Sequence, residues 1–169
     1  MRTARKCLVH YVDAAFDMTY EKTNYQKLGQ DLEALDVELN PQVETTQNIW
    51  GESSVTFSGY EPSTEVETFY HDASKQLEEK VIELAMSRQY GDACKTSYVE
   101  ALYREAENPG DPPVLIRAYR EDIVLVPTTY GGDVNGVQAP FEIHYCGNRV
   151  PGNFDRETRT FTPASSGEL

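Results

Sequence analysis

The sequence contains no apolar run near the length that crosses a bilayer. A transmembrane helix needs about 20 consecutive apolar residues, whereas the short apolar stretch that follows the first basic residues ends at Val12. A secretory leader would need a longer apolar stretch and small residues at a cleavage site. We therefore expect no membrane insertion and a protein made and kept in a cytoplasm.

Cysteine is scarce, with single residues at Cys7, Cys94 and Cys146. These three are odd in number, lie far apart and form no Cys-x-x-Cys pair, which argues against a disulfide framework and against a zinc site. Free thiols packed as small hydrophobes in a reducing cell are expected instead.

Basic residues are also few, with 15 Lys and Arg against 28 Asp and Glu and a net charge of -13. Binding along a nucleic-acid backbone depends on Lys and Arg that displace counterions. The charge balance therefore argues against a conventional DNA-binding protein.

The overall composition is typical of a folded globular protein, since 39% of the 169 residues are hydrophobic and 25% are charged. This length fits one domain with a real core and leaves little for a second. We expect a single domain over residues 1–169, frayed near 164–169 because its end is rich in serine and glycine.

Short segments of alternating apolar and polar residues predict a mainly β chain. In the clearest, 137–146, the apolar side chains share one face, although Pro140 cannot donate to a ladder and marks an edge or a bulge. Further strands are expected at 35–39, 54–58, 63–70, 97–105 and 114–126, with a closing hairpin at 149–154 and 159–162.

One segment has helical periodicity instead, because Leu77, Val81 and Leu84 form a stripe within 74–90. Ser74 is expected to cap the start of this helix, and Gly91 to end it in the left-handed conformation. The stretch 40–52 is polar and without a steady period, so it predicts a long loop, as do the glycines of 130–136. Loops of this length are usually functional.

No catalytic, cofactor-binding or metal-ligating pattern emerges. His10, His71 and His144 are far apart in sequence and have no ligand at a recurrent spacing. His144 beside Glu142 is the best candidate, but no nucleophile motif accompanies it. We expect no enzyme and no cofactor.

Several stretches, taken in order, resemble the major tail proteins that form the tube of long-tailed bacteriophages, in particular phages of Gram-positive bacteria. The resemblance runs over nearly the whole chain, with the helix in the expected place. It is carried by 28–41, 43–49, Gly51-Glu52, 58–62, the helix with Gly91-Asp92, 118–122, 130–133, 145–149 and Phe154-Asp155.

This resemblance implies a β-sandwich or half-barrel with a flanking helix, six copies of which close into a ring. Stacked rings would form a hollow tube around a tape-measure protein, bounded by tail-tip or baseplate and tail-terminator proteins. DNA would pass through without specific binding, in a virion tail assembled in the host bacterial cytoplasm. An acidic lumen would repel phosphate, which gives the negative charge a purpose.

Two sets of site residues follow as expectations. Acids on candidate inner strands would face the lumen: Glu65, Glu67, Glu100 and Glu142. Residues of the 40–52 loop would contact other subunits: Glu44, Thr45, Gln47, Asn48 and Trp50.

Other classes of protein stay open at this point. A head decoration protein or a pilus-like subunit would share the strands, the acidity and the absent chemistry. A small β-sandwich enzyme or carbohydrate-binding module is a further alternative, for which Glu142 with His144 would be the site to test.

Overall fold

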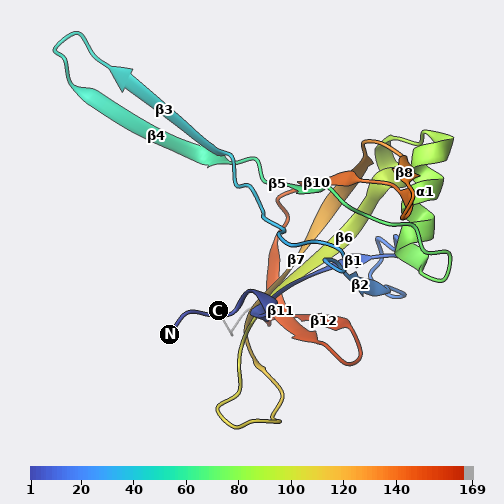
Figure 1. Cartoon of the computed structure of the whole chain (residues 1–169). Coiled ribbons are helices and arrows are strands. Elements are labelled where there is room, and N and C mark those ends of the chain that lie inside the picture. Colours follow the sequence, from blue (N-terminus) through green and yellow to red (C-terminus); the bar gives the residue numbers. More distant parts are fainter. Residues whose placement is uncertain (166–169) are drawn as a thin grey trace.

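The computed structural model describes residues 1–165. The expected fraying at 164–169 falls largely on residues outside this range. The chain builds an eight-stranded antiparallel sheet in the order β12-β11-β7-β6-β1-β2, with β10 paired to both β7 and β5. A long two-stranded arm leaves this body, as Figure 1 shows. The prediction of a mainly β fold with a flanking helix is confirmed.

The body has two long central strands, β6 and β7, and shorter strands towards both ends of the sheet. The strands are β1 (Leu8–Asp13), β2 (Tyr25–Lys27), β5 (Ser63–Val66), β6 (Lys95–Arg104), β7 (Val114–Pro127), β10 (Phe141–Tyr145), β11 (Val150–Asp155) and β12 (Thr160–Pro163). Two-stranded sheets are formed by β3 (Pro41–Gln47) with β4 (Ser53–Tyr60), and by β8 (Gly131–Asp133) with β9 (Gly136–Gln138). Short 3-10 helices lie at Arg5–Cys7 and Gly91–Cys94.

The first face of the sheet packs under α1 (Gln76–Ser87). Leu77, Val81 and Leu84 of the helix are buried against Tyr98 of β6 and Leu125 of β7, as the helical stripe predicts. Residues on this face alternate with residues on the other, because successive side chains of a strand point to opposite sides.

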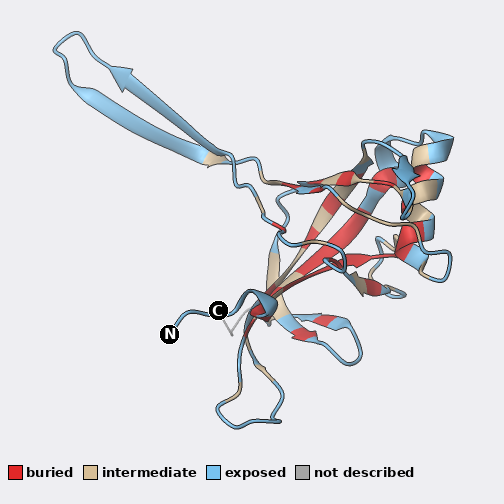
Figure 2. Ribbon diagram, in the orientation of Figure 1, coloured by how far each residue is buried: buried red, intermediate tan, exposed pale blue. Residues whose placement is uncertain are grey.

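The closing hairpin β11-β12 curls over part of the second face. Phe154 lies 4.6 Å from Tyr11 between ring centroids, and Phe161 joins the same buried cluster. Gly152 makes this close approach possible, since a Cβ there would lie 2.3 Å from the carbonyl oxygen of Thr162. The sheet is therefore covered on both sides near β1 and β6, as the burial colours of Figure 2 show.

Several sequence-based boundaries need correction. The segment 35–39 forms only the bridge Glu38–Ser63, not a strand, and the alternation of 63–70 ends as a strand at Val66. Much of 40–52 is strand β3, and most of 130–136 belongs to the β8-β9 hairpin rather than to a long loop. The thiols of Cys7 and Cys94 are buried as expected, but Cys146 is exposed.

The ends of α1 also differ from the prediction. Lys75 precedes the first turn, and the left-handed residue that ends the helix is Arg88. The hydroxyl of Ser74 donates to Asp72 at 2.6 Å instead of capping the helix. Gln26 of β2 takes this place, accepting from the Leu77 N–H at 3.1 Å. Because the capping residue comes from a strand distant in sequence, the residues around the start of the helix do not predict it.

Asp13, fully buried at the end of β1, organises the loop that leads to β2. Its carboxylate accepts hydrogen bonds from the backbone N–H groups of Ala15, Asp17 and Asn24 at 2.8–2.9 Å. Such a buried carboxylate is tolerated because its lone pairs are satisfied.

Replacing Asp13 by Ala should lower the free energy of unfolding by about 2 kcal/mol, because three backbone donors lose the charged acceptor that they share. The control is Asp155→Ala, which removes a similar cap from an exposed hairpin turn and should cost about 1 kcal/mol or less. Urea denaturation measures both. Equal effects of the two substitutions would contradict this role of Asp13.

Candidate assembly interface

The arm, defined as β3, β4 and the tip 48–52 between them, projects away from the body and packs against none of it (Figures 1 and 2). Every residue of β3 and β4 except Gly59 is exposed. A two-stranded hairpin of this kind is marginally stable in water by itself. In the monomer, the surface of both strands of the arm is therefore exposed to solvent.

The two faces of the arm differ in chemistry. Cross-strand pairs Val43–Phe57 and Thr45–Val55 lie on one face. Tyr60 extends this face, since its ring stands edge-on to Phe57 at 4.9 Å. We call Val43, Thr45, Val55, Phe57 and Tyr60 the apolar face of the arm.

The opposite face is polar. Glu44 pairs with Thr56, and Thr46 pairs with Ser54, whose hydroxyls are hydrogen-bonded at 2.8 Å. An amphipathic ribbon of this kind is expected to bury its apolar face in an assembly, since exposed contiguous apolar surface marks interaction sites.

The tip of the arm is held in one conformation by Asn48. Its side-chain oxygen accepts from the N–H groups of Trp50 and Glu52 at 2.9 and 3.0 Å, and its amide donates to the Glu52 carboxylate at 2.8 Å. Gln47 donates to the carbonyl of Gly51 at 3.1 Å. This ordered turn presents Ile49 and Trp50, which are 95% and 80% exposed.

The residues predicted as inter-subunit contacts all lie on the arm: Glu44, Thr45, Gln47, Asn48 and Trp50. Sequence reasoning missed Val43, Ile49, Val55 and Phe57, which carry most of its apolar surface. The signal was present in the alternation at Val55 and Phe57, which continues across the turn into β3. Contact of these residues with another subunit stays a prediction.

The root of the arm is tied to the body on both of its strands. Glu38 and Ser63 exchange backbone hydrogen bonds at 2.9 Å. Before the arm, the carbonyl of Leu35 accepts from Arg5 at 2.8 Å. After it, Thr64 shares a 2.8 Å hydrogen bond with the hydroxyl of Tyr145.

His10 stands at the centre of the buried polar groups below this root. Arg5 approaches its Nε2 at 3.2 Å, and because a guanidinium only donates, Nε2 must accept and Nδ1 carries the proton. Nδ1 then donates to Tyr98, which donates to Glu100 at 3.2 Å. Burial lowers the pKa of His10 to about 4, with Glu100 opposing and Arg5 adding to the shift.

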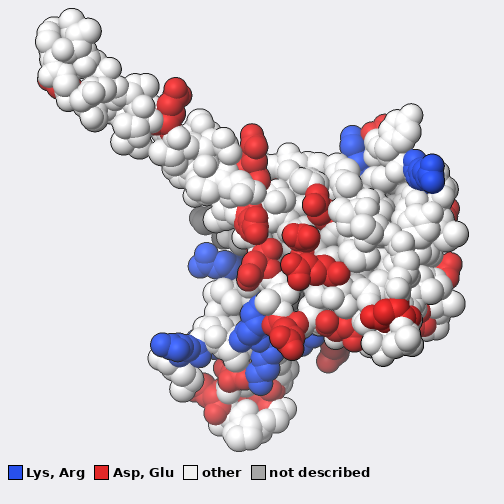
Figure 3. Space-filling view, turned by 45° about the horizontal axis from the view of Figure 1, so that its top comes forward, with Lys and Arg blue, Asp and Glu red and all other residues white. Residues whose placement is uncertain are grey.

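The candidate lumen acids do not all share one face. Glu65 of β5 and Glu142 of β10 are direct cross-strand partners on the side of the sheet that α1 does not cover. Glu67 follows the end of β5 and is exposed. Glu100 lies on the opposite face, beside His10, and forms a salt bridge with Arg149. Acidic side chains gather where the arm meets the body (Figure 3).

The pair Glu142 and His144 has the geometry of an exposed ion pair, at 3.1 Å. Within residues 1–165, no three His, Cys, Asp or Glu side chains converge in a way that could hold a metal ion. No helix in that range has the length and apolarity to span a membrane.

No protein-family model and no curated protein matches the chain. Among solved structures, its fold is similar to that of the sheath/tube terminator of an extracellular contractile injection system, PVC, in the extended state. The TM-score is 0.53 at 9% sequence identity, over 90% of this chain and 98% of that one. At this identity the likeness concerns the fold.

The buried neutral state of His10 predicts that acid destabilises the protein. The pKa of about 4 lies below the ordinary 6.5, so the unfolded chain binds the extra proton between these values and stability falls as pH falls through this window. The loss should approach about 3 kcal/mol by pH 4.

Urea denaturation between pH 7 and 4 measures this effect. His10→Asn keeps a donor near Tyr98 and removes the titrating ring, so its pH dependence should be weaker than that of the parent. An unchanged pH dependence in His10→Asn would contradict the assignment.

Proposed function

We propose that the chain is a structural subunit of the tube in a phage-tail-like particle, in which six copies close into a ring and rings stack. The observation that carries the proposal is the arm. A monomer gains little from a projecting ribbon whose apolar face and tip lie in water, whereas an assembly buries both.

Two further observations support this function. The fold is similar over almost its full length to a component named for its position on a sheath and tube. The sheet has open edges at β2, β5 and β12, and closing a ring of subunits is one way to cover such edges. Partners would then be other copies of the chain, a tape-measure protein, and the proteins at the two ends of the tube.

A tube terminator is the second candidate function, and the similarity to the injection-system terminator favours it. The two functions predict different growth of the polymer. A tube subunit adds ring upon ring, so polymer length rises with concentration, whereas a terminator forms one ring that ends growth. Both would place the protein in a tail-like particle.

Negative-stain microscopy and light scattering of the concentrated protein test the proposal. Stacked tubes would support the tube subunit, and single rings at every concentration would favour the terminator. A protein that stays monomeric at all concentrations and never enters tails in complementation would contradict both.

Removal of the arm separates assembly from folding. Joining Leu39 to Glu61 through Asn-Gly, a sequence suited to a two-residue hairpin turn, should abolish rings and tubes. The body should remain folded, because the arm contributes no buried apolar side chain. The matched control shortens the exposed hairpin at 156–158, which leaves the arm intact.

Circular dichroism and microscopy check the two variants. Loss of the fold on arm deletion would show that the arm belongs to the body. Normal tubes without the arm would refute its role in assembly.

We propose that the lumen is lined by the face of the sheet that α1 does not cover. This face carries Glu65 and Glu142, and Glu67 lies beside it. Like charges directly opposite on a sheet are destabilising, so this pair costs the free subunit some stability, and it would serve a surface that repels DNA phosphates. Sixfold repetition would turn each acid into a charged ring. Glu100 is a weaker candidate, because it is half-buried and already paired with Arg149.

Replacing Glu65 and Glu67 together by Lys should leave tubes intact but slow DNA ejection, through attraction between the new charges and phosphate. Added salt should relieve the delay by screening. The control is Glu79→Lys together with Glu83→Lys on the exposed side of α1. Ejection that stays unchanged at low salt would place Glu65 and Glu67 outside the lumen.

A further inference from the structure

Arg5 ties the segment that enters the arm to the body. Its guanidinium donates to the carbonyl of Leu35 at 2.8 Å and to the carbonyl of Leu8 at 2.6 Å. The nitrogen that reaches Leu35 also donates to Nε2 of His10 at 3.2 Å. Leu35 is buried and lies just before the Glu38–Ser63 bridge. The position of the entering segment therefore depends on Arg5, and Arg5 depends on an acceptor at Nε2 of His10.

The segment that leaves the arm is held by contacts that do not involve Arg5. Ser63 and Thr64 begin strand β5, and they pair with His144 and Ile143 of β10. The leaving segment is thus part of the main sheet. The entering segment is outside this sheet and is held by Arg5, by its buried Leu35 side chain and by hydrogen bonds to the leaving segment.

A proton on His10 would remove the acceptor that Arg5 uses. Because Nδ1 already carries the hydrogen donated to Tyr98, an added proton must bind at Nε2. Two cationic groups that only donate would then face each other, which is unfavourable. Arg5 is an exposed residue and lines, with His10 and Leu35, a hollow of about 180 Å³. The guanidinium can therefore turn into water without displacing a packed side chain.

Charged groups from neighbouring elements act on the ring in opposite directions. Oε2 of Glu100 lies 3.7 Å from Nδ1 and favours the charged ring, although Glu100 is itself paired with Arg149. Burial outweighs this attraction and lowers the pKa of His10 to about 4, and Arg5 lowers it further. Other charged residues line the hollow beside the ring: Lys6, Lys27 and Glu33. The ring is therefore neutral at pH 7 and becomes charged only in acid.

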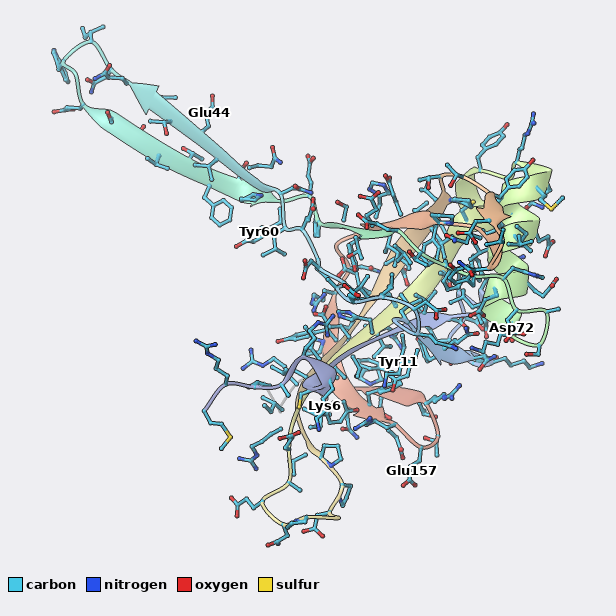
Figure 4. All side chains as sticks on the ribbon, in the orientation of Figure 1. Lys6, Tyr11, Glu44, Tyr60, Asp72 and Glu157 are labelled. Carbon is cyan, nitrogen blue, oxygen red and sulfur yellow. The ribbon has the colours of Figure 1, made fainter. Side chains whose placement is uncertain are left out.

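We infer that protonation of His10 releases Arg5 from Leu35 and so frees the segment that enters the arm, while the body stays folded. This inference concerns the free subunit and does not depend on the proposed function. Figure 4 shows Tyr60 at the root and Glu44 farther out along the arm. Because the arm packs against no part of the body, a change of angle at the root moves the whole arm. The arm thus has a fixed direction at neutral pH and a variable one in acid.

Pulsed electron paramagnetic resonance between two nitroxide labels tests this behaviour in the free subunit. The labels are placed at Glu44→Cys on the arm and at Glu83→Cys on α1, both exposed positions. Cys146→Ser removes the exposed native thiol, whereas Cys7 and Cys94 are buried. The distribution of label distances should be narrow at pH 7. It should widen roughly twofold towards pH 3.5, because one of the two segments at the root opens locally, with a midpoint near pH 4.

Two variants separate the ring from other groups that titrate in the same range. Carboxylates also take up protons near pH 4, so His10→Gln, which offers an acceptor and a donor but does not titrate, should keep the narrow distribution in acid. Arg5→Met keeps the stem of the side chain and removes the guanidinium. Its distribution should be wide at pH 7 as well.

Circular dichroism at each pH verifies that the body is folded. An equally narrow distribution in acid and at pH 7 in the folded parent would overturn the inference, and so would equal widening in His10→Gln. If acid unfolds the body or a variant fails to fold, Arg5→Met at pH 7 decides, and a narrow distribution there would refute the role of Arg5. These outcomes leave the proposed function standing, because no assembly is measured. Conversely, normal tubes formed without the arm would reject that function and leave this inference intact.

Discussion

A two-stranded ribbon has no second layer against which to bury side chains, so its strands gain stability mainly from cross-strand pairs. This constraint governs the arm. Its apolar face, with Val43, Val55 and Phe57, remains in water in the monomer. The root of the arm is held in place by the body, through the Glu38–Ser63 bridge and the buried groups around His10. The result is a folded body that carries an ordered, exposed ribbon.

The fixed root gives the arm a defined direction, and direction is what a repeating assembly needs. Contacts on both strands of the root, at Leu35 and at Thr64, converge on the network of Arg5, His10 and Tyr145. Burial raises the pKa of Tyr145 to about 12 and keeps His10 neutral. The neutral side chains of His10, Tyr98 and Tyr145 therefore lie in the middle of the network, and the charged side chains of Arg5, Glu100 and Arg149 flank them.

Much of the body could be predicted from the sequence, because the alternation of apolar and polar residues in its strands follows their burial. Strands β6, β7, β11 and β12 lie within a few residues of the expected ranges, since one or both faces of each pack on the core. The arm could not be predicted as a hairpin. Its β3 strand has one apolar residue, Val43, and its other positions are polar because no core selects them.

Other differences have non-local causes. The strand expected at 35–39 forms only one bridge because the chain there is leaving the body for the arm. Strand β1 lies between β6 and the edge strand β2 and is buried on both faces, so it shows no alternation. The Glu65–Glu142 pair arises where segments distant in sequence meet, and spacing along the chain does not report such a meeting.

In the proposed assembly, the arm passes from water into a contact between subunits. Trp50 is the protein's one tryptophan, so its fluorescence reports the arm tip without a label. We predict emission typical of a water-exposed indole in the free subunit, and a shift to shorter wavelength with loss of iodide quenching in assembled rings or tubes. Assemblies in which Trp50 keeps the emission and quenching of the free subunit would contradict it.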